Sequence, residues 1–289
     1  MKKLSILLAL VLMFTSIMCL AGCGEDADTA TDANAKTLVA TSVSFGDDFY
    51  AIGCRKEDSA VSDKINEALK TLIDNGKAAE ISNKWFGKNI VILEDYNEVL
   101  NKTTPNAEAW NYIKDKGELI VGLDDTFAPM GFRDENNTLV GFDIDLANAV
   151  GEVLGVKVKF QPIDWNSKEL ELSSKNIDCI WNGMSATVDR QTNMSLTKKY
   201  LNNEIIVVAA SDVTVNSKAD LANLKIATQE GSAALETLEA DADYKTFEEN
   251  ITTYPDYDAA ILDLQAGRID CIVIDKVLAE YKISKMSDK

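Results

Sequence analysis

Arg190 and Asp275 are the two side chains whose types and positions best suit ligand recognition. A planar guanidinium such as that of Arg190 can hold a carboxylate through two parallel hydrogen bonds, which a lysine does less well. Asp275 ends the apolar run 269–274, where a strand would present its carboxylate at the edge of a sheet. Each has a plainer alternative: Arg190 could pair with Asp189 on the surface, and Asp275 could cap a helix over 276–284.

The amino-acid composition excludes several classes of catalytic and binding function. The 289 residues include no histidine, which excludes His-based catalytic triads, proton shuttles and His-ligated metal sites. Asp124 and Asp125 could do acid–base work, but no nucleophile–base set accompanies them, so we predict a binding role and no catalytic residue, metal or cofactor. The formal net charge of −18 argues against a nucleic-acid partner.

The first residues predict export and a lipid anchor. Lys2 and Lys3 precede an uncharged apolar run over 4–20, the layout of a secretory signal, and the following Leu-Ala-Gly-Cys resembles a bacterial lipobox. We therefore expect a lipoprotein signal peptide over 1–22, lipidation at Cys23 and a flexible tether over 23–36. The alternative is a plain transmembrane anchor, for which the run is short. Of the other cysteines, Cys54, Cys179 and Cys271 are predicted as buried free thiols rather than a bridge.

Strands and helices alternate from residue 118 onwards. Apolar runs and period-two patterns predict strands at 119–123, 156–163, 177–181, 224–228 and 269–274, and helical spacing predicts helices at 143–154, 167–174, 232–240 and 257–266. This alternation predicts parallel sheets covered by helices. Residues 175–180 and 267–272 are similar to each other, which indicates two α/β lobes whose strands end at a common crevice.

Four blocks of sequence resemble the amino-acid-binding proteins of ABC importers, the family 3 solute-binding proteins. They are residues 121–129, 141–146, 178–190 and 266–275. The resemblance implies the α/β, two-lobed periplasmic-binding-protein (Venus-flytrap) fold of type II. It also implies a ligand between the lobes and hinges near 37–44 and 205–209.

The order of the blocks differs from that of the family. Residues 49–56, 64–69 and 84–87 resemble the family's C-terminal end, yet they come first. We therefore predict a circularly permuted chain, which is tolerable where the old termini lie close together at the surface. Lobe 1 would span 37–205, made of the family's C-terminal segment 37–87, a linker 88–109 and the family's N-terminal segment 110–205. Lobe 2 would span 206–289, and residues 43–87 should pack against 117–200.

The resemblance also implies the ligand-binding residues. Arg190 would take the carboxylate of a free amino acid and Asp275 its ammonium, while Phe127 and Trp165 would enclose its side chain. The full predicted set is Asp124, Phe127, Trp165, Asn182, Gly183, Ser185, Arg190, Gln229, Ser232, Ala233 and Asp275.

The predicted function is that of an exported, lipid-anchored receptor on the outer face of the cell membrane or in the periplasm. As a monomer it would bind a free amino acid, with a polar or cationic side chain favoured by Asp124 and the aromatic pair, and deliver it to the permease subunits of an ABC importer. The sequence does not name the amino acid. Two other readings are an amino-acid-sensing module for a receptor and a dehydratase-like enzyme on the same fold.

Overall fold

The computed structural model describes residues 35–97, 100 and 105–287. The predicted signal peptide, Cys23 and nearly all of the predicted tether lie outside these residues. Within them, no helix is both long and apolar enough to span a membrane.

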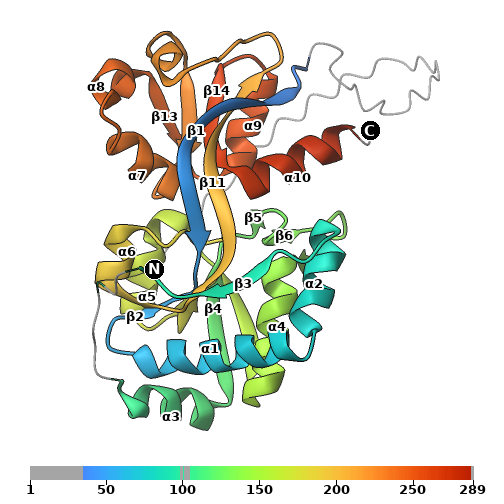
Figure 1. Ribbon diagram of the computed structural model, residues 1–289, viewed down its shortest axis with the longest axis vertical. Helices are drawn as coiled ribbons and strands as arrows, with labels where there is room; N and C mark the ends of the chain where they lie inside the picture. Colours follow the sequence, from blue (N-terminus) through green and yellow to red (C-terminus); the bar gives the residue numbers. More distant parts are fainter. Residues whose placement is uncertain (1–34, 98–99, 101–104, 288–289) are drawn as a thin grey trace, which may run out of the picture. The chain divides into compact units, whose positions relative to one another are not determined.

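Two mixed sheets organise the described residues (Figure 1). The six-stranded sheet has the order β1-β11-β14-β12-β13, with β3 paired to β11. Its strands are β1 (Leu38–Tyr50), β3 (Val91–Glu94), β11 (Lys199–Ala210), β12 (Ile226–Gln229), β13 (Ile251–Tyr254) and β14 (Cys271–Asp275). Strand β12 is parallel to β13 and β14, whereas β11 is antiparallel to β1, β3 and β14. The helices that follow these strands are α7 (Ala233–Glu239), α8 (Tyr244–Phe247), α9 (Tyr257–Gln265) and α10 (Lys276–Ser287).

The five-stranded sheet has the order β10-β2-β9-β4-β8. Its strands are β2 (Gly53–Arg55), β4 (Glu118–Leu123), β8 (Lys157–Pro162), β9 (Cys179–Ile180) and β10 (Met194–Leu196). Its helices are α1 (Ser59–Asp74), α2 (Lys77–Phe86), α3 (Ala107–Lys116), α4 (Phe142–Leu154), α5 (Lys168–Ser173) and α6 (Val188–Asn193). A small antiparallel sheet of β5 (Thr126–Phe127), β6 (Gly131–Arg133) and β7 (Leu139–Val140) follows β4. The predicted alternation of strands and helices is confirmed, but the two large sheets are mixed rather than parallel, because β1, β2, β3, β10 and β11 pair antiparallel.

The N-terminal part of the described chain packs as expected against the middle part. Strand β2 pairs with both β9 and β10, and α1 packs on α4. Arg55 adds hydrogen bonds to the carbonyls of Leu172 and Ile177, at 3.1 and 2.6 Å. The permuted order of the chain itself stays a prediction. The described residues of the predicted linker 88–109 include β3, whose Val91 and Glu94 pair with Leu201 and Lys199 of β11, and the start of α3.

Strands β1 and β11 run side by side from one sheet to the other (Figure 1). Their antiparallel ladder shifts register twice, between Ala40 and Ser44 and between Ser44 and Gly46. Two hydroxyls bridge the irregular part, because Thr41 Oγ1 donates to Val207 O at 2.9 Å and Ser44 Oγ donates to Ile205 O at 3.4 Å. Bulges of this kind increase the local bend and twist of a strand pair.

The predicted buried free thiols are confirmed. Cys54, Cys179 and Cys271 are each buried and free. Cys54 and Cys179 are direct partners in the antiparallel pair β2–β9. Burial raises the pKa of all three thiols, because a thiolate would lose its hydration in the core.

Candidate functional site

Five of the predicted site residues lie at or just after the ends of strands in the two large sheets. Asp124 follows β4, Trp165 follows β8 and Asn182 follows β9, all in the five-stranded sheet. Gln229 ends β12 and Asp275 ends β14, both in the six-stranded sheet. Strand ends are where open α/β sheets offer side chains to ligands, since the helices that follow turn away from the sheet edge.

Asp124 and Gln229 join the two sheets directly. The Gln229 amide Nε2 donates to Asp124 Oδ2 at 2.8 Å. The other oxygen of Asp124 accepts from the backbone amide and the hydroxyl of Thr126, at 2.9 and 2.7 Å. Burial nevertheless raises the pKa of Asp124. Close by in sequence, Phe127 packs against Tyr257 of α9 with ring centroids 6.1 Å apart.

Arg190 is buried, so its predicted alternative as a surface residue paired with Asp189 is wrong. Its side chain is only 2% exposed, since helix α6 begins at Val188 and turns Arg190 inward. Its Nη1 donates to Ser185 O at 3.0 Å, and its Nη2 reaches Gly231 O at 3.2 Å and Glu236 Oε1 at 3.1 Å. Its Nε has no hydrogen-bond partner among the described residues. A buried N–H left in this way is an unsatisfied donor.

The buried Asp275 forms an acidic pair with the half-buried Asp48, which the sequence did not reveal. Asn203 Nδ2 donates to both Asp275 Oδ1 and Asp48 Oδ2, at 2.7 and 2.8 Å, and Tyr50 donates to Asp275 Oδ1 at 2.8 Å. Burial and the neighbouring Asp48 raise the pKa of Asp275 to about 7, while Arg190 opposes the shift. Burial likewise raises the pKa of Asp48.

Asn203 also meets the start of helix α10. Its Oδ1 accepts from the Val277 amide at 3.3 Å. Asp48 lies on β1 and Asn203 on β11, so both come from the long strand pair rather than from loops. The sequence offered a weak signal for them, namely polar residues inside otherwise strand-like segments.

The remaining predicted residues lie around these groups. Ser185 Oγ donates to Asp48 Oδ2 at 2.7 Å. Gly183 has a φ of +56°, and a Cβ there would lie 2.8 Å from the Phe127 ring, so only glycine fits. With its amide turned to satisfy both neighbours, Asn182 donates to the Asp124 carbonyl at 2.9 Å.

Two predicted residues begin α7, and the two predicted aromatic residues do not meet. Ser232 caps that helix by accepting from the Leu235 amide at 3.1 Å, and Ala233 is its first residue. Phe127 and Trp165 belong to different apolar clusters. Trp165 instead makes a cation–π contact with Lys168, whose ammonium lies over the indole ring, 5.2 Å from the ring centroid.

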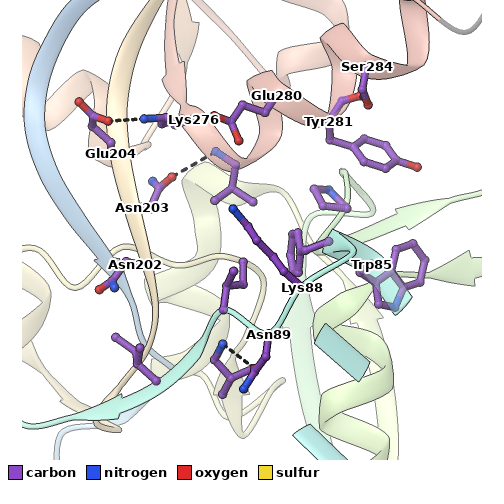
Figure 2. A pocket seen from close by; sticks show the side chains of 16 residues that line it. Trp85, Lys88, Asn89, Asn202, Asn203, Glu204, Lys276, Glu280, Tyr281 and Ser284 are labelled. Atoms are coloured by element: carbon purple, nitrogen blue, oxygen red, sulfur yellow. Dashed lines mark hydrogen bonds and ion pairs between the residues drawn. The ribbon is translucent and has the colours of Figure 1, made fainter. Parts of the chain in front are cut away.

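A cavity of about 770 Å³ lies beside the long strand pair (Figure 2). It is bounded by α10 on one side and by the segment leading into β3 on the other, and Lys88 extends into it. Asn203 lines the cavity, but none of the eleven predicted site residues does. We place the candidate site at the buried charges rather than at this cavity, because none of the cavity's charged residues is buried: Lys88 and Glu280 are exposed, and Glu204 and Lys276 form a half-buried ion pair. Among the described residues, no group of three or more Cys, Asp or Glu side chains is arranged to hold a metal ion.

Comparison with known proteins identifies similar chains. Residues 119–253 match the model of the bacterial extracellular solute-binding proteins, family 3. The chain is 28% identical over 183 residues to the L-cystine-binding protein of Escherichia coli (strain K12), covering 62% of this chain and 66% of that protein. It is 27% identical over 168 residues to the arginine-binding extracellular protein of Bacillus subtilis (strain 168), covering 57% and 64%. The match thus spans less than two thirds of the length of these curated relatives.

A solved structure supports the same assignment. The histidine-bound substrate-binding protein of an ABC uptake transporter from Streptococcus pneumoniae is 35% identical, with a TM-score of 0.60, over 62% of this chain and 74% of that one. The predicted fold class is confirmed to this extent: the chain has an α/β mixed-sheet fold that matches type II periplasmic-binding proteins. The three relatives are described as binding proteins rather than as enzymes.

Proposed function

The chain belongs to the bacterial extracellular solute-binding proteins of family 3, and on that basis we propose that it binds a free amino acid for an ABC importer. The observation that carries the proposal is the buried Arg190, whose Nε–H is unsatisfied, near the buried Asp275 and the half-buried Asp48. A free amino acid supplies the complementary charges: its carboxylate suits the guanidinium, and its ammonium suits the acidic pair.

The charge balance of the site favours a ligand with a cationic side chain. Asp48, Asp124 and Asp275 are buried or nearly so, and each has a pKa raised by loss of hydration. A second positive group on the ligand would stabilise the ionised form of Asp124, the acid that lies apart from the Asp48–Asp275 pair. The arginine-binding relative from Bacillus subtilis agrees with this preference.

A ligand screen tests the proposal. The purified protein is heated with each of the twenty amino acids and with L-cystine, and hits are measured by calorimetry. A ligand at a hundred times its Kd should stabilise the fold by about 2.7 kcal/mol. Arg190→Lys should weaken binding because one ammonium cannot replace the two-pronged guanidinium. Arg268→Lys, on an exposed surface ion pair, is the matched control and should bind like wild type. No response to any compound would contradict the proposal.

We propose further that the protein is exported and anchored by lipid at Cys23. The support is the apolar run after Lys2 and Lys3 and the Leu-Ala-Gly-Cys motif that ends it. Cys23→Ser should move the protein from the membrane fraction to the soluble exported fraction. Cys19→Ser, within the apolar run, is the control and should leave the protein with the membrane. Membrane retention of the Cys23→Ser protein would contradict the anchor.

The circular permutation is likewise our proposal. It is supported by the pairing of β2 with β9 and β10, which seats the early segment inside the five-stranded sheet. A reordered chain, with 110–289 followed by 37–87, should fold cooperatively and bind the same ligand with similar affinity. If that chain fails to fold while the native order folds, the proposed order is wrong.

A further inference from the structure

Lys168 is a buried cation that neither the sequence analysis nor the proposed function uses. It is the first residue of α5, and only 4% of its side chain is exposed. Its ammonium donates to Gly231 O at 2.8 Å and to Trp165 O at 3.3 Å. The Glu169 carboxylate lies 3.2 Å away but is half exposed, so water screens much of its charge.

The Gly231 carbonyl oxygen accepts hydrogen bonds from two cationic side chains. Besides Lys168 Nζ at 2.8 Å, Arg190 Nη2 donates to the same oxygen at 3.2 Å. A neutral carbonyl offers two lone pairs but no charge, so it satisfies both donors without neutralising either of them. The carboxylates that pair with these cations, Glu169 with Lys168 and Glu236 with Arg190, are 51% and 39% exposed, so water screens much of their charge. Burial and the nearby Arg190 both lower the pKa of Lys168, as expected for two buried cations that repel each other.

The backbone around Gly231 is built for this close approach. Gly231 has a φ of +65°, and a Cβ there would lie 2.9 Å from Asn166 Oδ1 and 3.4 Å from Lys168 Nζ. Asn166 itself donates to Glu230 Oε1 at 2.9 Å, so the segment before α7 is tied to the start of α5 at both Glu230 and Gly231. The two cations are therefore held together, with the unsatisfied Nε of Arg190 beside them.

We propose that Lys168 and Arg190 together bind the carboxylate of the ligand. A carboxylate has two oxygens with about four acceptor positions, so it can accept from both cations that now share one carbonyl oxygen. It would also supply the negative charge that the carbonyl lacks. This inference rests on the proposed function, because it assigns a residue to the same ligand.

The assignment predicts strong discrimination for the charged carboxylate. When the ligand's carboxylate is replaced by a neutral carboxamide, a subsite with two cations loses more binding affinity than a subsite with one cation. The alternative is that Lys168 only fastens the two loops through Gly231 O. In that case every ligand would depend on Lys168 equally, whatever its charge.

Calorimetry with a matched pair of ligands separates these two roles. The probes are the amino acid that binds wild type most tightly in the screen and its carboxamide; for arginine these are L-arginine and L-argininamide. Lys168→Met should lose about 10- to 100-fold in affinity for the amino acid and only about twofold for the carboxamide. An equal loss for both probes, or no loss for either, would overturn the assignment.

Two further variants serve as controls for the effect of Lys168→Met. Lys168→Arg keeps the charge and should recover part of the affinity for the amino acid, and Lys198→Met, at an exposed ion pair with Asp95, should change nothing. Unfolding of each variant without ligand checks that it is folded. A wild-type protein that binds no amino acid contradicts the proposed function, whereas normal wild-type binding with an unaffected Lys168→Met variant contradicts only the role of Lys168.

Discussion

Replacing Asp275 with asparagine should stabilise the ligand-free protein while weakening its ligand binding. Burial removes water from the Asp275 carboxylate, and the nearby Asp48 carboxylate repels its charge; together these two effects raise the pKa of Asp275 to about 7. Asparagine is similar in shape, and its Oδ1 can still accept from Tyr50 and Asn203, the present partners. The substitution therefore removes an unfavourable buried charge and keeps the hydrogen bonds. It also removes the anion that we assign to the ligand's ammonium.

The size of the stabilisation follows from the pKa. A rise from 3.8 to about 7 is roughly three units, which corresponds to about 4 kcal/mol as an upper limit above pH 8. Because the folded state binds the extra proton, wild-type stability should fall as the pH rises from about 4 to 7. The advantage of Asp275→Asn should therefore be absent at pH 4 and complete at pH 8. Part of the effect belongs to Asp48, so we expect a measured gain of about 1–4 kcal/mol.

Urea unfolding without ligand at pH 4 and pH 8 measures this gain, and calorimetry at pH 8 measures binding. Loss of one member of a buried charge pair should weaken binding by about 2–5 kcal/mol. Asp263→Asn is the control, since Arg268 holds the pKa of Asp263 below its ordinary value and the substitution should destabilise instead. An Asp275→Asn protein that is less stable than wild type at pH 8 would refute the reasoning about the buried acid.

Three other outcomes follow from the same structure. Ligand binding at pH 6 should release protons, because an ammonium beside Asp275 lowers the raised pKa of this carboxyl group. Calorimetry in buffers of different ionisation heat measures the number of protons released. Asp275→Asn should abolish this release. Gly231→Ala should weaken binding by about tenfold or more, since its Cβ would meet Asn166 and its φ is +65°, and normal affinity would contradict this close approach. Cys54 and Cys179 should react with a thiol reagent only after unfolding, because burial raises the pKa of both thiols. Fast reaction of the folded protein in a colorimetric thiol assay would show instead that the two thiols are accessible.

The sequence predicted the elements well because most of the signals are local. The helix over 143–154 and the strand over 119–123 appear almost at their predicted bounds, as α4 and β4, since apolar periodicity fixes both. The β3 strand was missed, because residues 91–94 become a strand only through pairing with β11, a partner distant in sequence. Propensity alone does not report such a pairing.

The candidate site was predictable in part. Asp275 could be named because it ends an apolar, strand-like run, and Arg190 because its guanidinium suits a carboxylate and it lies in a block that resembles the family, although the burial and partners of both could not be predicted. Asp48 and Asn203 lie within strands, so their only local signal is a polar residue in a strand-like segment, which solvent-facing residues share. Lys168 escaped notice because a lysine in a short polar helix is ordinarily exposed, and its burial depends on the distant Gly231.

The two register shifts between β1 and β11 carry a consequence for hydrogen exchange. Where the ladder is irregular, hydroxyl oxygens replace backbone carbonyls as acceptors: the amides of Val43 and Gly46 donate to Thr41 Oγ1 and Ser44 Oγ, at 3.1 and 3.0 Å. A hydroxyl rotates freely and can exchange its partner for water, so these two amides should take up deuterium early. Regular ladder amides on either side of them should remain protected far longer. The slowest and fastest amides of this strand pair would then lie within a few residues of each other, marking the segment that bends.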